Sequence, residues 1–187
     1  MKNLIIISAP SGTGKTTLCK ALQKKFPNVK WSVSYTTRKI RKMEKNGEDY
    51  HFISDTSFKR LIKQSFFAEW ERVHGFYYGT SKKTIDYIIK NNDILLLEMD
   101  VKGALSIKKL YPDKTFSIFI TPPSIDHLRK RLQNRGTDSK DRINIRLKRF
   151  KEEMKYISRF DLNLLNDDLI LAKKQLLDIF LKIKKGE

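Results

Sequence analysis

Residues 9–17, Ala-Pro-Ser-Gly-Thr-Gly-Lys-Thr-Thr, constrain the fold of this chain more than any other stretch. The apolar run at 4–7 precedes them and is typical of a buried strand. Leu18, Leu22 and Phe26 follow them at a spacing of four residues, which places these side chains on one stripe of a helix. A glycine-rich turn between a strand and a helix is the context in which a phosphate-binding loop forms.

The residue types in this loop explain how it would bind an anion. Gly12 and Gly14 let the backbone curl so that successive N–H groups point at one anion, and the helix N-terminus adds its positive dipole end. Lys15 can reach the β- and γ-phosphates of a nucleotide, and the Thr16 hydroxyl can bind Mg²⁺. Ala9 stands where the full pattern has glycine, and we expect the loop to tolerate one methyl group. The alternative is a tight turn with a surface lysine.

The composition indicates one globular domain. The chain has 187 residues, of which 40% are hydrophobic, so it can bury a sizeable core. No apolar run approaches the length of a membrane span, and the run at 4–7 is too short for a signal sequence, so we expect a cytoplasmic protein without a membrane partner. Cys19 is the single cysteine, and its place in the first helix favours a buried packing role.

The formal net charge of +18 raises the question of nucleic-acid binding. Lys and Arg are spread along the whole chain, mostly on the polar faces of the expected helices, and no dense basic tail occurs. We therefore expect a solvated basic surface with no specific nucleic-acid partner. A nucleic-acid-binding NTPase remains an alternative that rests on charge alone.

Strand and helix patterns alternate along most of the chain, which predicts an α/β fold with a parallel sheet covered by helices on both faces. Alternating or continuous apolar runs predict strands at 4–7, 30–35, 51–53, 66–73, 76–80, 93–99, 115–120 and 162–165. Apolar stripes predict the intervening helices, one of which begins near Asp55 or Ser57 as its cap. The short strands between 30 and 80 interrupt the alternation and indicate a small inserted α+β lobe.

Four arginines flank residues 136–138 at helical spacing: Arg131 and Arg135 before them, and Arg142 and Arg146 after them. A glycine-containing hinge between two arginine-bearing helix ends suits a helical lid that closes over polyphosphate, because guanidinium groups meet phosphate oxygens bidentately. The alternative is a helical hairpin with solvated arginines.

Three carboxylates are further candidates. Glu98 and Asp100 end an apolar strand, where ligands bind in parallel sheets, and could hold Mg²⁺ or a donor group of a substrate. The alternative is that an acid simply ends the strand. Glu69 lies among aromatic residues on a strand whose alternation points it outward, so its position alone says little.

With these features in place, the sequence resembles guanylate kinase over nearly its whole length. The phosphate loop alone is shared with many unrelated NTPases, whereas the arginine- and tyrosine-rich stretches in this order are specific. The resemblance rests on SAPSGTGK at 8–15, SVSYTTR at 32–38, GEDYHF at 47–52, YYGT at 77–80, and RGT at 135–137 with NDD at 166–168.

The resemblance implies transfer of the γ-phosphoryl group of ATP to GMP, and to dGMP, with Mg²⁺ as cofactor, in purine nucleotide metabolism. The ATP-binding positions would be Ala9, Pro10, Ser11, Gly12, Thr13, Gly14, Lys15, Thr16, Thr17 and Asn166. The GMP-binding positions would be Arg38, Arg41, Tyr50 and Tyr78 for the phosphate, and Ser34, Glu69, Gly79, Thr80 and Asp100 around the guanine. The catalytic set would be Lys15, Arg38, Arg131, Arg135 and Arg146, and the metal would be held by Thr16, with Glu98 as a second ligand.

The resemblance also implies a division of the single domain at 1–187. The core would comprise 1–32, 89–123 and 148–187, the GMP-binding lobe 33–88 and the lid 124–147. Two residues depart from the family pattern: Glu98 stands where Asp is usual, and Ile40 stands where Pro is common, which predicts a looser loop.

We expect a monomer or a small homo-oligomer whose partners are its substrates, GMP and ATP. Two readings compete within this fold. One is a non-catalytic protein-binding module, although such modules lose the phosphate loop that this chain keeps. The other is a related kinase of another phosphorylated acceptor, such as a sugar phosphate.

Overall fold

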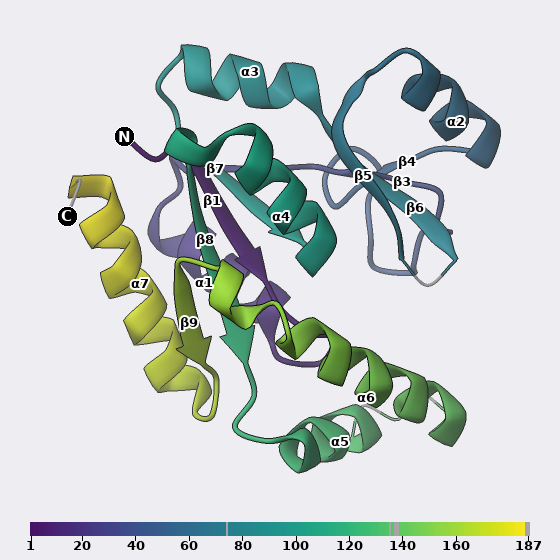
Figure 1. The fold of residues 1–187 in the computed structure, drawn as a ribbon, viewed down its shortest axis with the longest axis vertical. Helices are drawn as coiled ribbons and strands as arrows, with labels where there is room; N and C mark the ends of the chain where they lie inside the picture. Colours follow the sequence, from purple (N-terminus) through teal and green to yellow (C-terminus); the bar gives the residue numbers. More distant parts are fainter. Residues whose placement is uncertain (74, 135, 137–138, 186–187) are drawn as a thin grey trace.

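The computed structural model describes residues 1–73, 75–134, 136 and 139–185. Within these residues, the centre of the molecule is a five-stranded parallel sheet in the order β2-β7-β1-β8-β9 (Figure 1). Its strands, in that order, are Lys30–Trp31, Leu95–Met99, Leu4–Ser8, Thr115–Thr121 and Leu162–Leu165. The predicted α/β class with a parallel core sheet is confirmed.

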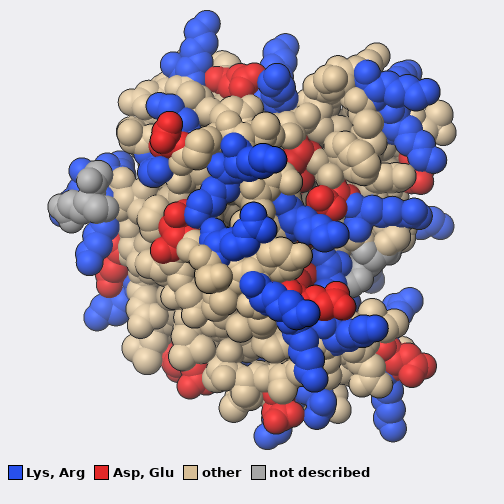
Figure 2. Space-filling model, viewed as in Figure 1, with Lys and Arg blue, Asp and Glu red and all other residues tan. Residues whose placement is uncertain are grey.

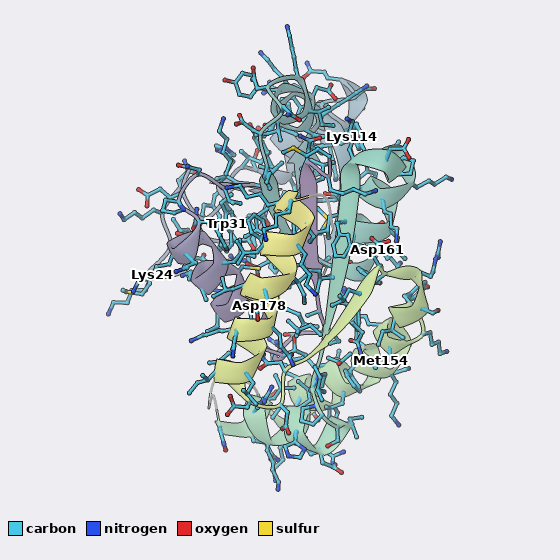
Figure 3. All side chains as sticks on the ribbon, turned by 90° about the vertical axis from the view of Figure 1, so that its left-hand side faces the viewer. Lys24, Trp31, Lys114, Met154, Asp161 and Asp178 are labelled. Atoms are coloured by element: carbon cyan, nitrogen blue, oxygen red, sulfur yellow. The ribbon has the colours of Figure 1, made fainter. Side chains whose placement is uncertain are left out.

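Helices cover both faces of this sheet. On one face lie α1 (Lys15–Lys25) and α7 (Leu169–Lys185), which Figure 3 shows side by side. On the other face lie α3 (Lys82–Lys90) and α4 (Val101–Leu110). Strand β1 contributes Ile5 and Ile7 to the first core and Leu4 and Ile6 to the second, because successive side chains of a strand point to opposite faces. Burial on both faces explains why β1 reads as a continuous apolar run.

A smaller four-stranded sheet lies beyond one edge of the core, at the upper right of Figure 1. Its order is β4-β3-β6-β5, with bounds His51–Phe52, Tyr35–Thr36, Phe76–Ser81 and Phe67–Val73. Helix α2 (Asp55–Lys63) packs on it through Phe58, which is fully buried and stacks on Phe67 and Tyr77. This sheet therefore has an aromatic core of its own.

Helices α5 (Ile125–Asn134) and α6 (Lys140–Met154) form a pair at the lower right of Figure 1. A separate apolar cluster joins them, in which Leu128 and Leu132 face Leu147 and Phe150. The remaining elements are two short 3₁₀ turns, η1 (Pro112–Lys114) and η2 (Ile157–Arg159). Helix α6 continues past residue 147, and α3 buries Ile85 and Ile88 in the main core. The predicted division of the domain into a core, a lobe at 33–88 and a lid at 124–147 therefore stays a prediction.

Two local predictions are wrong. The strand expected at 30–35 is two two-residue strands that belong to different sheets, since β2 pairs with β7 and β3 pairs with β4 and β6. The cap of α2 is Ser54, whose side chain accepts from the Ser57 N–H, and not Asp55 or Ser57. Ser54 is the cap because the N-cap side chain must precede the first helical turn in order to accept from the free N–H groups of that turn.

Cys19 is fully buried under β1, as expected for a packing residue. Figure 2 shows Lys and Arg distributed over the visible face with acidic side chains among them. Within the described ranges, no helix has the length and apolarity that a membrane crossing requires.

Candidate active site

The phosphate loop takes a shape that only glycine accommodates easily. Gly12 and Gly14 have φ of 96° and 89°, in the left-handed region. Gly14 is the N-cap of α1 and supplies no side chain to satisfy the first turn, so the N–H groups there face outward. Thr13 is buried and its hydroxyl donates to the Pro10 carbonyl at 2.9 Å. Ala9 is buried and leaves this geometry intact, as expected.

Two side chains connect the loop to the end of strand β7. Lys15 Nζ donates to the Met99 carbonyl at 3.0 Å, and the Thr16 hydroxyl donates to Glu98 Oε1 at 2.6 Å. The structure therefore brings Thr16 and Glu98 together, as the sequence analysis predicted for a metal site.

On the other side of the loop, Asn166 and Arg131 fix the turn between β9 and α7. The Asn166 amide donates to the Thr13 carbonyl at 2.6 Å, and Arg131 Nη2 donates to the Asn166 and Asp167 carbonyls at 3.0 Å each. Both residues line a cavity of about 350 Å³ together with Gly12, Gly14, Thr17, Asn134 and Leu169. Arg131 thus holds the wall of this cavity rather than projecting freely over the loop.

Arg146 lies on α6 and donates to the Ser11 hydroxyl, so it reaches the phosphate loop from the helix pair. Arg135, which the sequence analysis placed in the catalytic set, falls outside the described residues. Arg142 occupies the first turn of α6, where its backbone N–H donates to the N-cap Ser139.

Directly above the loop lies a cavity of about 250 Å³, and a second one of about 170 Å³ adjoins it. The first is lined by the loop residues 9–12 and 14–17 together with Val73, Asp100, Arg149 and Glu153. The second is lined by Lys15, Ser34, Tyr50, Glu69, Val73, Tyr78, Gly79, Glu98, Met99 and Asp100. The two cavities share Lys15, Val73 and Asp100, so they form adjoining chambers that meet at the carboxyl end of β7.

Glu69 in the second cavity has an unusual environment. It is partly buried on β5, and burial raises the pKa of its carboxyl group to about 7, with the nearby charges of Asp100 and Glu71 acting in the same direction. The Thr80 hydroxyl donates to Glu69 Oε1 at 2.6 Å, which lowers the pKa and opposes these effects. A threonine hydroxyl has one proton, so Thr80 is engaged with Glu69 and acts on a ligand through it.

Gly103 on α4 makes the space for this carboxylate. A Cβ atom at this position would lie 2.8 Å from Glu69 Oε2 and 3.1 Å from Asp100 Oδ1. Asp100 is the N-cap of α4, where its Oδ1 accepts from the Gly103 N–H at 3.2 Å. The missing side chain of Gly103 therefore lets two carboxylates approach the same end of α4.

Arg38 is held by a partner that the sequence analysis missed. Its Nη1 and Nη2 donate to the two carboxylate oxygens of Glu44 at 2.9 and 2.8 Å, and its Nε donates to the Tyr78 hydroxyl at 3.2 Å. Glu44 also accepts from the Arg41 backbone N–H at 2.9 Å. The hydrogen bonds from Arg38 hold the pKa of Glu44 below its ordinary value, although burial alone would raise it. Glu44 therefore connects the two residues that flank the segment around Ile40, and the expectation of a looser loop there stays a prediction.

Arg38 and Arg41 line a large cavity of about 890 Å³ that also includes Ser34, Tyr50 and Tyr78. Ser34, Tyr50 and Tyr78 line the Glu69 cavity as well, so the large cavity opens into it. The structure thus brings the predicted acceptor residues to one connected space, except for Thr80, which lines neither cavity and donates to Glu69.

Comparison with known proteins decides the family. The sequence model described as guanylate kinase matches residues 1–182. The chain belongs to the guanylate kinase family. The family predicted from the sequence is therefore confirmed.

Individual guanylate kinases agree closely with this chain. It is 43% identical over 176 residues to the guanylate kinase of Wolinella succinogenes, covering 94% of this chain and 82% of that relative. It is 45% identical over 178 residues to the guanylate kinase of Porphyromonas gingivalis, covering 94% and 95%. The crystal structure of guanylate kinase from Anaplasma phagocytophilum superposes with a TM-score of 0.80 at 28% identity, covering 96% of this chain and 85% of that one.

The unpredicted residues of this guanylate kinase site include Glu44, Gly103, Arg149 and Glu153. Glu44 lies in an irregular loop, where no periodicity indicates a partner for Arg38. Gly103 lies in a helix, where glycine is unfavourable by about 1 kcal/mol relative to alanine, and that cost is itself a signal of a packing requirement. Arg149 and Glu153 are four residues apart on α6, which is a spacing readable from sequence.

Proposed function

We propose that this chain transfers the γ-phosphoryl group of ATP to GMP, giving ADP and GDP. Membership of the guanylate kinase family makes it a nucleoside monophosphate kinase, a phosphotransferase. The observation that supports transfer between two bound ligands is the pair of chambers that meet at Lys15 and Asp100. A phosphate donor bound over the loop and a phosphate acceptor bound near Glu69 would face each other across this junction, where water can be excluded.

On the donor side, the backbone N–H groups at 12–16 and the N-terminus of α1 would bind the phosphates of ATP. Lys15 lies at the junction and would neutralise charge on the transferred group, while Arg146 would reach the same group from α6. The cavity lined by Asn166 and Arg131 would receive the adenine end, with Arg131 acting by holding the turn.

On the acceptor side, Arg38, Arg41, Tyr50 and Tyr78 would bind the phosphate of GMP. The guanine would contact the Glu69 carboxylate, because guanine offers two donors on its N1/N2 edge and an ionised carboxylate only accepts. Ser34 and Asp100 line the same chamber, with Thr80 and Gly103 positioning Glu69.

Mg²⁺ fits the pair formed by Thr16 and Glu98. The described residues contain no group of three or more His, Cys, Asp or Glu side chains that could hold a metal. Mg²⁺ in phosphotransferases uses one or two protein oxygens together with substrate phosphates, which matches a hydroxyl and one carboxylate at the mouth of the loop. Mg²⁺ would supply charge neutralisation on the β- and γ-phosphates.

The same proposal describes the parts and partners of the molecule. The lobe at 33–88 and the lid at 124–147 would close on the core during turnover. The alternative of a non-catalytic binding module is not favoured, because Gly12, Gly14, Lys15 and Thr16 are all present and both glycines have positive φ. The distributed charge would act on nucleotides and not on a specific nucleic acid, and the protein would work in the cytoplasm as a monomer or small homo-oligomer.

An assay of ADP release with GMP, IMP and AMP as acceptors tests this function. We expect kcat/KM for GMP to exceed that for AMP by roughly 10⁴, because buried polar groups left unpaired by adenine reject it strongly. IMP lacks the 2-amino group and falls between them. Glu69→Gln is expected to lower kcat/KM for GMP by about 10²-fold and to reduce the ratio of kcat/KM for GMP to that for IMP. The matched control is Glu152→Gln, which removes an exposed carboxylate on α6 that lies outside the cavities. An AMP rate comparable to the GMP rate would refute the proposal.

A further inference from the structure

Arg149 is a cationic side chain in the chamber over the phosphate loop, next to Asp100 at the junction, and neither the sequence motifs nor the proposed roles include it. It extends from α6 into the cavity over the phosphate loop, beside Asp100 and Glu153. Lys15 and Asp100 are shared with the acceptor chamber. Through its contact with Asp100, Arg149 therefore lies beside the route of a group that passes from one chamber to the other.

The geometry fixes this guanidinium in place. Arg149 Nε donates to Glu153 Oε1 at 2.6 Å, and Nη2 lies 3.5 Å from Asp100 Oδ2. The side chain is only 28% exposed, which is far less than a solvated helix arginine. Within the described part of the chain, no hydrogen bond of Arg149 uses Nη1. The residue thus combines a held orientation with donors that are not yet used.

The charges around the junction require such a cation. Asp100 and Glu153 line the cavity, and a phosphoryl group in transit would bring further negative charge next to them. Like charges that lie close together repel more strongly where water is excluded. Among the described residues that line this cavity, Lys15 and Arg149 are the two cations that can offset the repulsion.

We infer that Arg149 is a further catalytic residue, which donates from Nη1 to a non-bridging oxygen of the phosphoryl group in transit. The inference rests on the proposed transfer from ATP to GMP. A phosphate oxygen of GMP forms the new bond to phosphorus, and the bond from phosphorus to the β–γ bridging oxygen breaks. The electron pair leaves with ADP. Arg149 keeps its protons throughout and acts by charge and hydrogen bonding, which are strongest on the charge of the transition state.

A purely structural role gives a different expectation. A pair of opposite charges four residues apart on a helix stabilises that helix only modestly. If Arg149 served only to pair with Glu153, its loss would lower stability slightly and leave the rate constants unchanged.

Steady-state kinetics of Arg149→Gln, with ATP and GMP each varied, separate the two roles. We expect kcat to fall by about 30-fold while both KM values stay within about threefold. The matched control is Lys148→Gln, which removes one positive charge from an exposed position next to it on α6 and is expected to retain wild-type kinetics. Arg149→Lys keeps the charge without the planar donors and is expected to lose about fivefold to tenfold in kcat.

The outcomes distinguish this inference from the function on which it rests. If wild-type protein turns over GMP and Arg149→Gln keeps kcat within twofold, the inference alone is overturned. A raised KM at unchanged kcat also overturns it, because Arg149 would then be a docking residue. If wild type shows no GMP-dependent ADP release, the proposed function fails and the inference fails with it. If thermal melting shows that Arg149→Gln does not fold, the kcat of Arg149→Lys is compared with that of Lys148→Gln. Equal kcat values for these two variants would overturn the inference.

Discussion

The phosphate loop and the pocket around Glu69 adjoin each other, yet they are assembled in opposite ways. The loop is one contiguous stretch, 9–17, whose binding groups are mostly backbone N–H groups aimed by two glycines and a helix end. Apart from Lys15, which it shares with the loop, the pocket draws side chains from residues between 34 and 100, on two sheets and the loops between them. Its character comes from partly buried carboxylates and tyrosines rather than from backbone.

This difference has physical consequences for recognition. Backbone donors cannot be altered by changing a side chain, so they suit a phosphate chain that every nucleotide shares. Side-chain carboxylates can be tuned by burial, as the raised pKa of Glu69 shows, and they suit the choice of one base. We therefore expect changes on the loop side to affect turnover and ATP, and changes on the pocket side to affect GMP.

The largest effect is expected from Lys15→Ala. Loss of its charge at the junction should lower kcat by about 10³-fold or more, because it acts on the transferred group. GMP binding, measured by calorimetry, should weaken by less than about tenfold, since the other contacts of the pocket remain. Lys24→Ala on the same helix is the control, because Lys24 is exposed and outside the cavities. Near-normal turnover by Lys15→Ala would contradict the role of the phosphate loop in phosphoryl transfer.

Two glycine substitutions test the separation without altering any polar group. Gly103→Ala places a methyl group 2.8 Å from Glu69 Oε2, and Gly14→Ala places one 2.6 Å from the Asn166 amide at a φ of 89°. We expect Gly103→Ala to raise KM for GMP by about 10- to 100-fold with KM for ATP unchanged, and Gly14→Ala to show the reverse pattern. Initial rates with each substrate varied provide the measurement. Equal effects on both KM values from either variant would show that the two sides are not separable.

The smallest effect is a pH dependence that sharpens the comparison. With a Glu69 pKa of about 7, roughly one tenth of the carboxyl is ionised at pH 6 and nine tenths at pH 8. If the ionised form binds guanine, KM for GMP should be about ninefold lower at pH 8 than at pH 6, with no such change for ATP. Glu69→Gln should lack this component, which separates it from titration of the GMP phosphate near pH 6. A pH dependence that persists in Glu69→Gln would assign it to another group.

The same pKa affects stability with a definite sign. The native carboxyl holds its proton up to about pH 7, whereas the unfolded one releases it near 4.5. The native state therefore binds more protons between these values, and this group lowers the free energy of unfolding as pH rises from about 4.5 to about 7. The pocket thus keeps its selective carboxylate at a cost in stability.

Features formed by neighbouring residues could be predicted from the sequence, whereas features formed by residues far apart in the chain could not. The loop and the core strands were predictable because neighbouring residues carry the pattern, as in the apolar run of β1. The split of 30–35 into β2 and β3 was not, since a two-residue strand is too short to show a period. The burial of Glu69 was hidden because alternation marks the face of β5 but not the close approach of α4 at Gly103. The partnership of Arg38 with Glu44 depends on loop geometry, which no periodicity encodes.

Because Cys19 is buried, the rate at which its thiol is labelled can report local opening of the fold. Desolvation raises the pKa of its thiol, with Glu98 acting in the same direction, so the reactive thiolate is scarce while α1 stays packed on the sheet. A thiol reagent can reach the sulfur only after α1 separates from the sheet, and each molecule can be labelled once. The labelling rate therefore reports how often the nucleotide-binding layer opens, in the way that amide exchange reports local unfolding. A nucleotide bound over the loop, at the start of the same helix, would lower the labelling rate of Cys19 in proportion to its occupancy.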